Sequence, residues 1–192
     1  MEEKNYSRRN FLRTAAMGAT AVAAGQLFSA SGKTPESEAK PNAPDPSLKI
    51  FVCSVCGHVE FGMAPDNCPV CHAPKDKFNQ DNKLFSDAEE KLKDGGTKHT
   101  PVISVRKDPK LISELPCHEV DVRVGKTMHP MEDAHHIKFI DFYGDDKHLT
   151  RIILPLSLYP AASIYIKVPG SKVRAVEWCN LHGYWTTEVS LA

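Results

Sequence analysis

Residues 119–124 read Glu-Val-Asp-Val-Arg-Val, a strict alternation of polar and apolar side chains. Because successive side chains of a strand point to opposite faces of its sheet, this pattern is typical of a strand with one buried face. Six other segments also have the composition of strands and are separated by turn residues: 101–105, 137–143, 148–154, 161–168, 172–178 and 184–191. Seven short strands in about 95 residues predict a mainly β chain built around an immunoglobulin-like β-sandwich.

The composition narrows the possible functions. The 192 residues include 24 Lys and Arg and 24 Asp and Glu, so the formal net charge is zero. This balance argues against a basic nucleic-acid-binding protein, and we expect no nucleic-acid partner. No apolar run reaches the roughly 18–20 residues that cross a bilayer, so we expect no stable membrane span in the mature chain. Six Cys and nine His remain as the residues most suited to carry chemistry.

The first 31 residues have the pattern of an export signal. Two adjacent arginines, Arg8 and Arg9, are followed by Phe11 and Leu12, by an Ala-rich stretch to residue 28, and by Ser-Ala-Ser at 29–31. This order resembles a twin-arginine signal peptide with a small-residue cleavage site. An amphipathic helix that stays on the protein is the alternative, but the stretch lacks a polar face. We therefore expect export, with a periplasmic or otherwise extracytoplasmic location.

The rest of the chain divides by composition. Residues 32–48 are rich in Pro and polar side chains and are typical of a tether. Residues 49–80 form a Cys-bearing module, residues 81–96 a helical linker, and residues 97–192 the sandwich. In the linker, Ser86 and Glu89 have the spacing of a helix-capping box, and Gly95 is a plausible stop.

Four cysteines in the module have the spacing of a metal site. Cys53 and Cys56 form one Cys-x-x-Cys pair and Cys68 and Cys71 another, with eleven residues between the pairs. Two such pairs supply a tetrahedral set of four thiolates, which suits structural zinc or redox-active iron. Two disulfides are the alternative for an exported chain, but the paired spacing favours a metal.

The amino-acid sequence around these cysteines resembles that of the rubredoxin-like domain of rubrerythrins. The match covers about thirty residues, from Phe51 to Phe78. It implies an iron held by four cysteines that transfers one electron, with zinc as the open alternative. The chain departs from the family at His72, where that family usually has Gly. We therefore expect a strained backbone at this turn.

A second group of metal-binding residue types lies in the sandwich region. His129, His135, His136, Cys179 and His182 come from separated segments, with His99 upstream. Each residue alone is a weak signal, but together they supply imidazoles and a thiolate for a site enclosed by loops. Because His135 and His136 are adjacent, they point to opposite faces of an extended chain, and at most one of them should bind a metal.

The motifs around these residues resemble superoxide reductase of the desulfoferrodoxin/neelaredoxin family. They are Lys98-His99-x-Pro101, His129-Pro130-Met131 with the 135–136 pair, and Cys179-Asn180-x-His182. The resemblance implies an iron with four histidines and an axial cysteine, which reduces superoxide to hydrogen peroxide. It assigns His99, His129, His135, Cys179 and His182 as ligands and Lys98 as the residue beside the open position. It also implies an unidentified electron donor, and we expect a homo-oligomer.

Three features depart from that family or stay unassigned. Most relatives have a Glu just before the lysine, which closes the sixth iron position in the oxidised state, whereas this chain has Thr97. We therefore expect an open or solvent-capped position unless Glu114 or Glu119 takes the place of that Glu. The N-terminal module resembles rubredoxin, and not the desulforedoxin type with adjacent cysteines. Cys117 has no assigned role, and we expect a partly buried small side chain.

Three functions fit these features. The first is a superoxide reductase with two irons, in which the four-Cys centre relays an electron to the His/Cys centre. The second is an electron-transfer or metal-binding protein with structural zinc in the four-Cys site. The third is a copper-binding β-sandwich. The presence of four His and the lack of an evident axial Met argue against this third function.

Overall fold

The computed structural model describes residue 45 and residues 47–86, 95–107, 109–112, 115–167 and 170–191. These residues belong to one contact unit, which spans 35–192. The predicted export signal at 1–31 and the capping partner Glu89 lie outside the described residues. No helix in the described ranges is long and apolar enough to cross a membrane.

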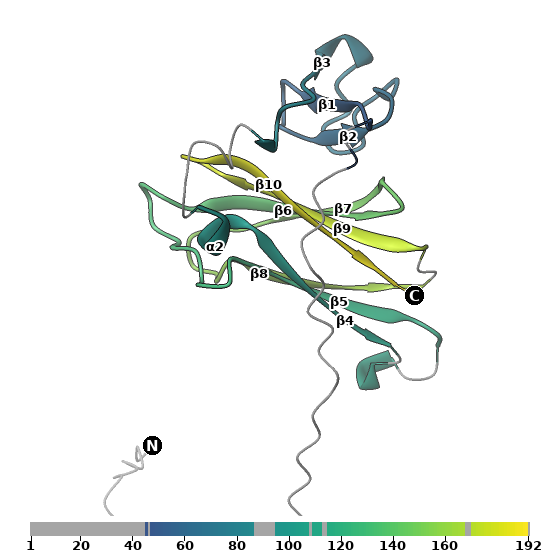
Figure 1. Cartoon of the computed structure of the whole chain (residues 1–192), viewed down its shortest axis with the longest axis vertical. Helices are drawn as coiled ribbons and strands as arrows, with labels where there is room; N and C mark the ends of the chain where they lie inside the picture. Colours follow the sequence, from purple (N-terminus) through teal and green to yellow (C-terminus); the bar gives the residue numbers. More distant parts are fainter. Residues whose placement is uncertain are drawn as a thin grey trace, which may run out of the picture. The chain divides into compact units, whose positions relative to one another are not determined.

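Two antiparallel sheets form the sandwich (Figure 1). One sheet has the order β4-β5-β8 and the other the order β10-β9-β6-β7. The seven strands are β4 (Pro101–Lys107), β5 (His118–Val124), β6 (Ile137–Gly144), β7 (Lys147–Ile153), β8 (Ala161–Ile166), β9 (Lys172–Cys179) and β10 (Gly183–Ser190). The predicted seven-stranded sandwich is confirmed, and the predicted strand ends differ from the observed ones by at most two residues.

The apolar side chains of the alternating segment that predicted β5 are buried in the core. Val120, Val122 and Val124 are each no more than 1% exposed and pack between the sheets. They belong to a cluster with Ile103, Ile137, Ile140, Phe142, Leu154, Val173, Ala175, Cys179 and Val189. Burial of this apolar surface is the main favourable contribution to folding, and it fixes the strand ends from which the loops emerge.

Two short helical turns interrupt the region that was expected to be linker and strands. Helix α2 (Gly95–His99) precedes β4, and the 3-10 helix η2 (Lys110–Ile112) follows it. Gly95 therefore begins a described helical turn, whereas the sequence suggested a stop at this residue. The difference matters because α2 carries the predicted site residues Lys98 and His99.

The Cys-bearing module is a small three-stranded sheet with two loops. Its strands are β1 (Ile50–Cys53), β2 (Val59–Phe61) and β3 (Phe78–Gln80), in the order β2-β1-β3, with the 3-10 helix η1 (Lys75–Lys77) before β3. His72 has a φ of 60°, in the left-handed region that non-glycine residues rarely adopt. The strain expected at this turn is thus confirmed.

Three side chains of the sandwich donate hydrogen bonds to backbone carbonyls of one module loop. Arg151 Nη1 donates to Cys56 O at 2.7 Å, Tyr143 Oη donates to Val59 O at 2.7 Å, and Tyr184 Oη donates to Gly57 O at 3.0 Å. An apolar cluster that includes Phe61 of the module and Tyr143 of β6 accompanies them. The module is therefore held on the four-stranded sheet by specific hydrogen bonds and a shared apolar cluster.

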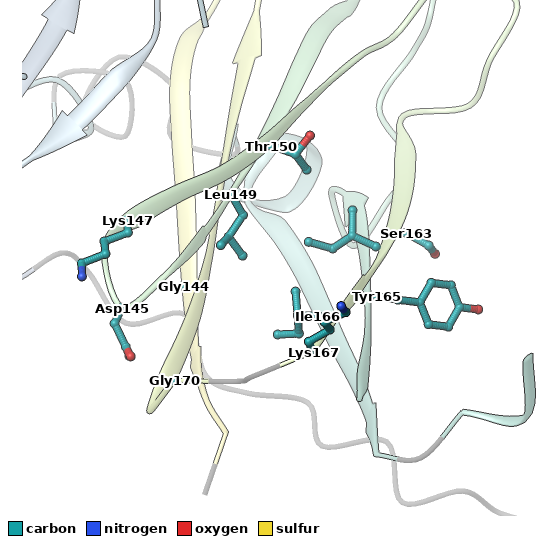
Figure 2. A pocket seen from close by; sticks show the side chains of 11 residues that line it. Gly144, Asp145, Lys147, Leu149, Thr150, Ser163, Tyr165, Ile166, Lys167 and Gly170 are labelled. Atoms are coloured by element: carbon teal, nitrogen blue, oxygen red, sulfur yellow. The ribbon is translucent and has the colours of Figure 1, made fainter. Parts of the chain in front are cut away.

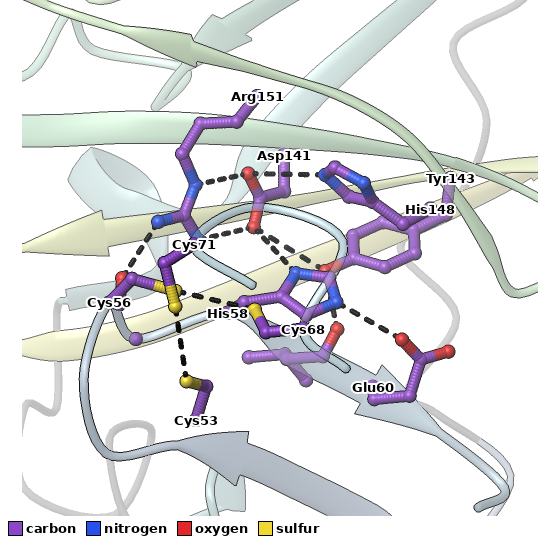
Figure 3. A network of polar contacts seen from close by, with 12 residues as sticks. Cys53, Cys56, His58, Glu60, Cys68, Cys71, Asp141, Tyr143, His148 and Arg151 are labelled. Atoms are coloured by element: carbon purple, nitrogen blue, oxygen red, sulfur yellow. Dashed lines mark hydrogen bonds and ion pairs between the residues drawn. The ribbon is translucent and has the colours of Figure 1, made fainter. Parts of the chain in front are cut away.

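A buried ion pair supports this contact (Figure 3). Arg151 Nε and Nη2 donate to the two carboxylate oxygens of Asp141, each at 2.7 Å. His58 Nδ1 and His148 Nε2 face the same carboxylate at 3.6 and 3.7 Å. These two imidazoles and the carboxylate have ligand types that can hold a metal, but Arg151 already occupies both oxygens with its positive charge. We interpret the group as an ion-pair network.

The charge of Asp141 depends on these neighbours. Burial would raise the pKa of Asp141, but its hydrogen bonds with Arg151 and its contacts with His148 and His58 hold that pKa well below the usual value. Asp141 is fully buried, and the Arg151 side chain is 9% exposed. The pair is thus ionised at neutral pH and shielded from solvent.

Asp141→Asn should destabilise the protein strongly, because it leaves the Arg151 guanidinium buried without its counter-charge. We expect a loss of about 3–5 kcal/mol in the free energy of unfolding, measured by urea unfolding of the metal-loaded chain. Asp66→Asn is the control, since Asp66 pairs with Lys75 on the exposed surface of the module and should cost about 0–1 kcal/mol. Equal small losses for both variants would contradict this reading.

Candidate metal centres

The four predicted cysteines come together at the loops of the module. Cys53 ends β1, Cys56 lies in the turn after it, and Cys68 and Cys71 lie in the second loop. Each Cys-x-x-Cys turn is closed by a backbone bond to the carbonyl of its first cysteine, from Gly57 N–H to Cys53 at 2.8 Å and from His72 N–H to Cys68 at 2.9 Å. The two loops therefore present their thiols to a common centre.

The sulfur separations match a tetrahedral metal site. Cys53 Sγ lies 3.7 Å from Cys71 Sγ, and Cys56 Sγ lies 3.6 Å from Cys68 Sγ. Two metal–sulfur bonds of about 2.3 Å at the tetrahedral angle would put the sulfurs about 3.8 Å apart. A disulfide needs a separation of about 2.05 Å, and all four thiols are free. The arrangement fits a single ion held by four thiolates.

The five residues predicted for the second centre also converge. Their ligand atoms all lie within 4.8 Å of one another: His99, His129, His135, Cys179 and His182. His99 ends α2, and Cys179 ends β9. His129 and His135 lie between β5 and β6, and His182 lies in the turn between β9 and β10. Three separate chain segments, around residues 99, 129–135 and 179–182, thus meet at one end of the sandwich.

The four imidazoles are arranged in a ring. Neighbouring rings in the cyclic order His99, His129, His135, His182 have centroids 4.4–4.7 Å apart and are inclined by 72–80°. The opposite pair His99 and His135 is wider, at 5.9 Å. Such a cycle presents four nitrogens around one point, as a square of metal ligands requires.

Hydrogen bonds set which nitrogen faces the centre. His99 Nδ1–H donates to Gly95 O at 2.9 Å, and His129 Nδ1–H donates to Pro130 O at 2.6 Å, so both rings turn Nε2 inward. His99 Nε2 then lies 2.9 Å from His182 Nδ1, close to the roughly 3.0 Å between ligands at right angles around a metal with bonds of about 2.1 Å. A backbone partner of this kind typically fixes the tautomer of a metal-binding histidine.

The ring nitrogens also lack other partners. His129 Nε2 and His135 Nε2 are buried and make no hydrogen bond within the described structure, an arrangement that costs about 1–3 kcal/mol for a polar group without a ligand. Burial lowers the pKa of His99 and of His129 to about 4. Both rings are therefore neutral at pH 7, the form that binds a metal. The donor set fits a metal ion.

A glycine allows α2 to approach the site. Gly125 has a φ of 81°, and a Cβ at this position would lie 2.4 Å from Lys98 O and 2.3 Å from Thr127 O. The close approach lets Thr127 N–H donate to Thr97 O at 3.1 Å. Gly125 thereby fixes the helical turn that carries His99, a role that the sequence alone did not indicate.

Asn180 ties two of the ligand-bearing loops together. Its Oδ1 accepts from His136 N–H at 2.9 Å, its Nδ2 donates to Ala134 O at 3.0 Å, and its backbone N–H donates to His136 O at 3.1 Å. The loop that carries His135 is therefore fixed to the turn that carries Cys179. Asn180 was part of a quoted motif, but its spacing alone gave no signal for this bridging role.

Two buried residues lie behind the ring of histidines. Trp185 stacks on His99, with centroids 4.9 Å apart and an inclination of 20°. Glu177 faces Trp185 across the β9–β10 register and is fully buried without a hydrogen-bond partner within the described residues. Burial raises the pKa of Glu177 well above its usual value.

Other residues singled out from the sequence lie outside this cluster. His136 turns away and donates from Nδ1 to Glu132 O at 3.0 Å. Thr97 and Lys98 are exposed on α2 beside His99. Cys117 is buried, as expected, and belongs to neither group of ligand types among the described residues.

Glu119 does not replace the carboxylate that Thr97 lacks. It accepts from Tyr165 Oη and pairs with Arg106, both at 3.0 Å. In the β4–β5 register Glu119 lies opposite Arg106. It is five residues along β5 from Val124, whose carbonyl accepts from His129 N–H at 3.3 Å, and five residues span roughly 17 Å at the usual strand rise. Glu114 lies outside the described residues.

A surface groove runs along the edges of the two sheets, between β7 and β8 (Figure 2). Its walls include Leu149 and Thr150 of β7, Tyr165 and Ile166 of β8, and Asp145 of the β6–β7 turn. No residue of the four-Cys group or of the histidine and cysteine cluster lines this groove. The groove is thus separate from both centres.

Comparison with known proteins places these features in a family context. The desulfoferrodoxin family model matches residues 91–188, and the model of the rubredoxin-like domain of rubrerythrin matches residues 51–79. Desulfoferrodoxin of Desulfarculus baarsii is 34% identical over 146 residues, which cover 73% of this chain and 96% of that protein. Superoxide reductase of Pyrococcus abyssi is 32% identical over 108 residues, which cover 50% of this chain and 89% of that protein.

Among solved structures, superoxide reductase from Nanoarchaeum equitans is similar, with a TM-score of 0.41 and 32% identity. The match covers 50% of this chain and 94% of that one.

Asn180→Ala should weaken metal binding at the histidine cluster, because it frees the loop that carries His135. We expect an affinity lower by roughly 10–100-fold, the usual effect of losing a residue that orients a ligand. Titration of the apo-protein with zinc against a competing chelator measures this change. Asn79→Ala, on the exposed surface of β3, is the control, and equal affinities for the two variants would show that Asn180 does not position the site.

Proposed function

Because the chain belongs to the desulfoferrodoxin family, we propose that it is a superoxide reductase that acts at an iron held by the histidine and cysteine cluster. The observation that carries this proposal is the ring of four imidazoles around one point, with the Cys179 thiol as fifth donor. Iron in such a site supplies one electron and a position for an anionic oxygen species. Reduction of superoxide to hydrogen peroxide needs that electron and two protons.

The protein sets the charge of the site. Four neutral imidazoles leave the positive charge of an ion uncompensated, which favours the approach of an anion. The single thiolate, from Cys179, supplies electron density from a buried position. These donors are held rigidly by Asn180 and Gly125, so little reorganisation accompanies a change of charge.

Lys98 is the residue that we assign to substrate attraction. Burial is the main cause of the low pKa of His99 and of His135, and the charge of Lys98 adds to it in both cases. Lys98 directly precedes His99 in the chain, and its side chain is exposed to solvent. It attracts superoxide and donates a proton through water.

We assign the four-Cys centre as an iron that relays electrons to the histidine cluster. The three hydrogen bonds from Arg151, Tyr143 and Tyr184 support this role, because they hold the module in a defined position on the sandwich. Structural zinc fits the same sulfur geometry and is the second candidate for this site. An external donor would reduce the relay.

The location follows from the sequence of the first 31 residues. The arginine pair and the small residues at 29–31 support export through the twin-arginine route. This route carries folded proteins, so both centres would be loaded before export. The homo-oligomer expected from the family resemblance belongs to the same proposal.

The purified, iron-loaded chain should consume superoxide and form one hydrogen peroxide per superoxide without releasing dioxygen. Peroxide and dioxygen electrodes measure both products during a steady supply of superoxide and reductant. Release of dioxygen would indicate dismutation and would contradict the proposal.

Lys98→Ala should slow the reaction with superoxide by about tenfold at low ionic strength, because it removes local attraction for the anion. The difference should shrink as salt is added, since the screening length falls to about 10 Å at 0.1 M. Pulse radiolysis measures the second-order rate. Lys77→Ala, an equal charge change in the module, should match the parent chain, and an unchanged rate for Lys98→Ala would remove this residue from the mechanism.

Replacing Cys68 and Cys71 by Ser should remove the four-Cys iron and leave the first reduction of superoxide intact, because the histidine cluster lies in the sandwich. Re-reduction by an external donor should become slower. Single-turnover stopped-flow spectroscopy separates the two steps, with Cys117→Ser as the control. Loss of the first step, with the histidine cluster still loaded, would refute this division of labour.

A further inference from the structure

Tyr184 joins the loop of the four-Cys centre to β10, the strand that follows the turn carrying His182 of the second centre. Its hydroxyl donates to the carbonyl oxygen of Gly57, the residue that follows Cys56. A Cβ on Gly57 would lie 2.6 Å from this hydroxyl. A side chain on residue 57 would therefore displace the tyrosine hydroxyl, and the positive φ of 71° also favours glycine here.

The other end of Tyr184 leads to the histidine cluster in two ways. Along β10 it is connected to His182 by the backbone of a single intervening residue, Gly183. Across the sheet it lies opposite Trp178 in the β9–β10 register. The two rings stack, with centroids 5.9 Å apart and an inclination of 18°, and Trp178 is bonded directly to Cys179.

The other contacts with the module loop lead to the cluster less directly. Tyr143 donates to Val59 O, but the residues before it on β6, Asp141 and Phe142, are not ligands of the histidine cluster. Arg151 donates to Cys56 O and lies over the Phe139 ring, which in turn packs on Trp178. That path crosses two non-bonded gaps before it reaches Cys179. Electron tunnelling weakens faster across such gaps than along covalent and hydrogen bonds.

We propose that Tyr184 is the residue that couples the two centres, so that electrons pass from Cys56 and Gly57 through Tyr184 to His182 and, through Trp178, to Cys179. The inference rests on the relay function proposed above. In each transfer, ferrous iron at the four cysteines loses one electron and ferric iron at the histidine cluster gains it. No bond forms or breaks and no proton moves, because Tyr184 and Trp178 act as a bridge and are not oxidised.

The structure offers a matched pair of variants. Tyr184→Phe and Tyr143→Phe each delete one phenol hydroxyl, and each leaves one carbonyl of residues 57–59 without its donor. Tyr143→Phe also removes a longer contact with Asp141 Oδ2, at 3.5 Å. Only Tyr184 lies on the proposed route. Hydrogen exchange at the amides of residues 57–59 measures how far each variant loosens the module and should change to a similar extent in both.

The transfer itself is followed by absorption. Full-length protein with both irons reduced is mixed with one equivalent of superoxide, and the appearance of the ferric four-Cys spectrum is recorded at several protein concentrations. The parent chain should show a first-order phase that is independent of concentration. Tyr184→Phe should slow this phase severalfold, and Tyr143→Phe should leave it unchanged. Trp178→Leu, a second variant, should slow it as well.

The outcomes separate the two claims. An unchanged phase in both Tyr184→Phe and Trp178→Leu would overturn the route and leave the relay standing. Equal slowing in Tyr184→Phe and Tyr143→Phe would also overturn it, because docking alone would then set the rate. Absence of a concentration-independent phase in the parent chain would overturn the relay and the route together.

Discussion

The histidine and cysteine centre depends on one constraint: five donor atoms from three chain segments must meet within a few ångströms. The sandwich meets it by ending α2, β9 and the loop before β6 at the same end of the two sheets. Asn180 then bonds one loop to the neighbouring turn, and the positive φ of Gly125 admits α2. The ligand geometry thus depends on hydrogen bonds and a close backbone approach outside the ligand set.

The second centre depends on the sandwich in a different way. Its four thiols are arranged by their own two turns, and the larger domain supplies donors that hold the module in place. Arg151 is one of these donors, since it donates to the Cys56 carbonyl. Its charge is neutralised by Asp141 within the sandwich. Burying such a pair costs desolvation, so its presence is better explained by the fixed position it gives the module than by stability alone.

The sequence predicted those features that depend on local patterns of residues, namely the strands and the four-Cys group of metal ligands. Alternation in residues 119–124 located β5, and the spacing of the cysteines located the four-Cys group. The histidines and Cys179 of the second group were assigned from the resemblance to superoxide reductase. Because adjacent side chains of an extended segment point to opposite faces, the sequence correctly indicated that only one of His135 and His136 would face the cluster. The roles of Tyr143, Arg151 and Tyr184 could not be predicted, because each looks like an ordinary strand residue until the module packs against it. The same holds for Asn180 and Gly125, whose roles depend on loops that are distant in sequence.

The central claim is that this chain holds two different iron centres, one with four thiolates and one with four imidazoles and a thiolate. Mössbauer spectroscopy of the purified, iron-enriched protein tests this most directly. The account predicts two iron species of equal area, one with the parameters of tetrahedral iron–sulfur coordination. A single iron species accompanied by one equivalent of zinc would contradict it.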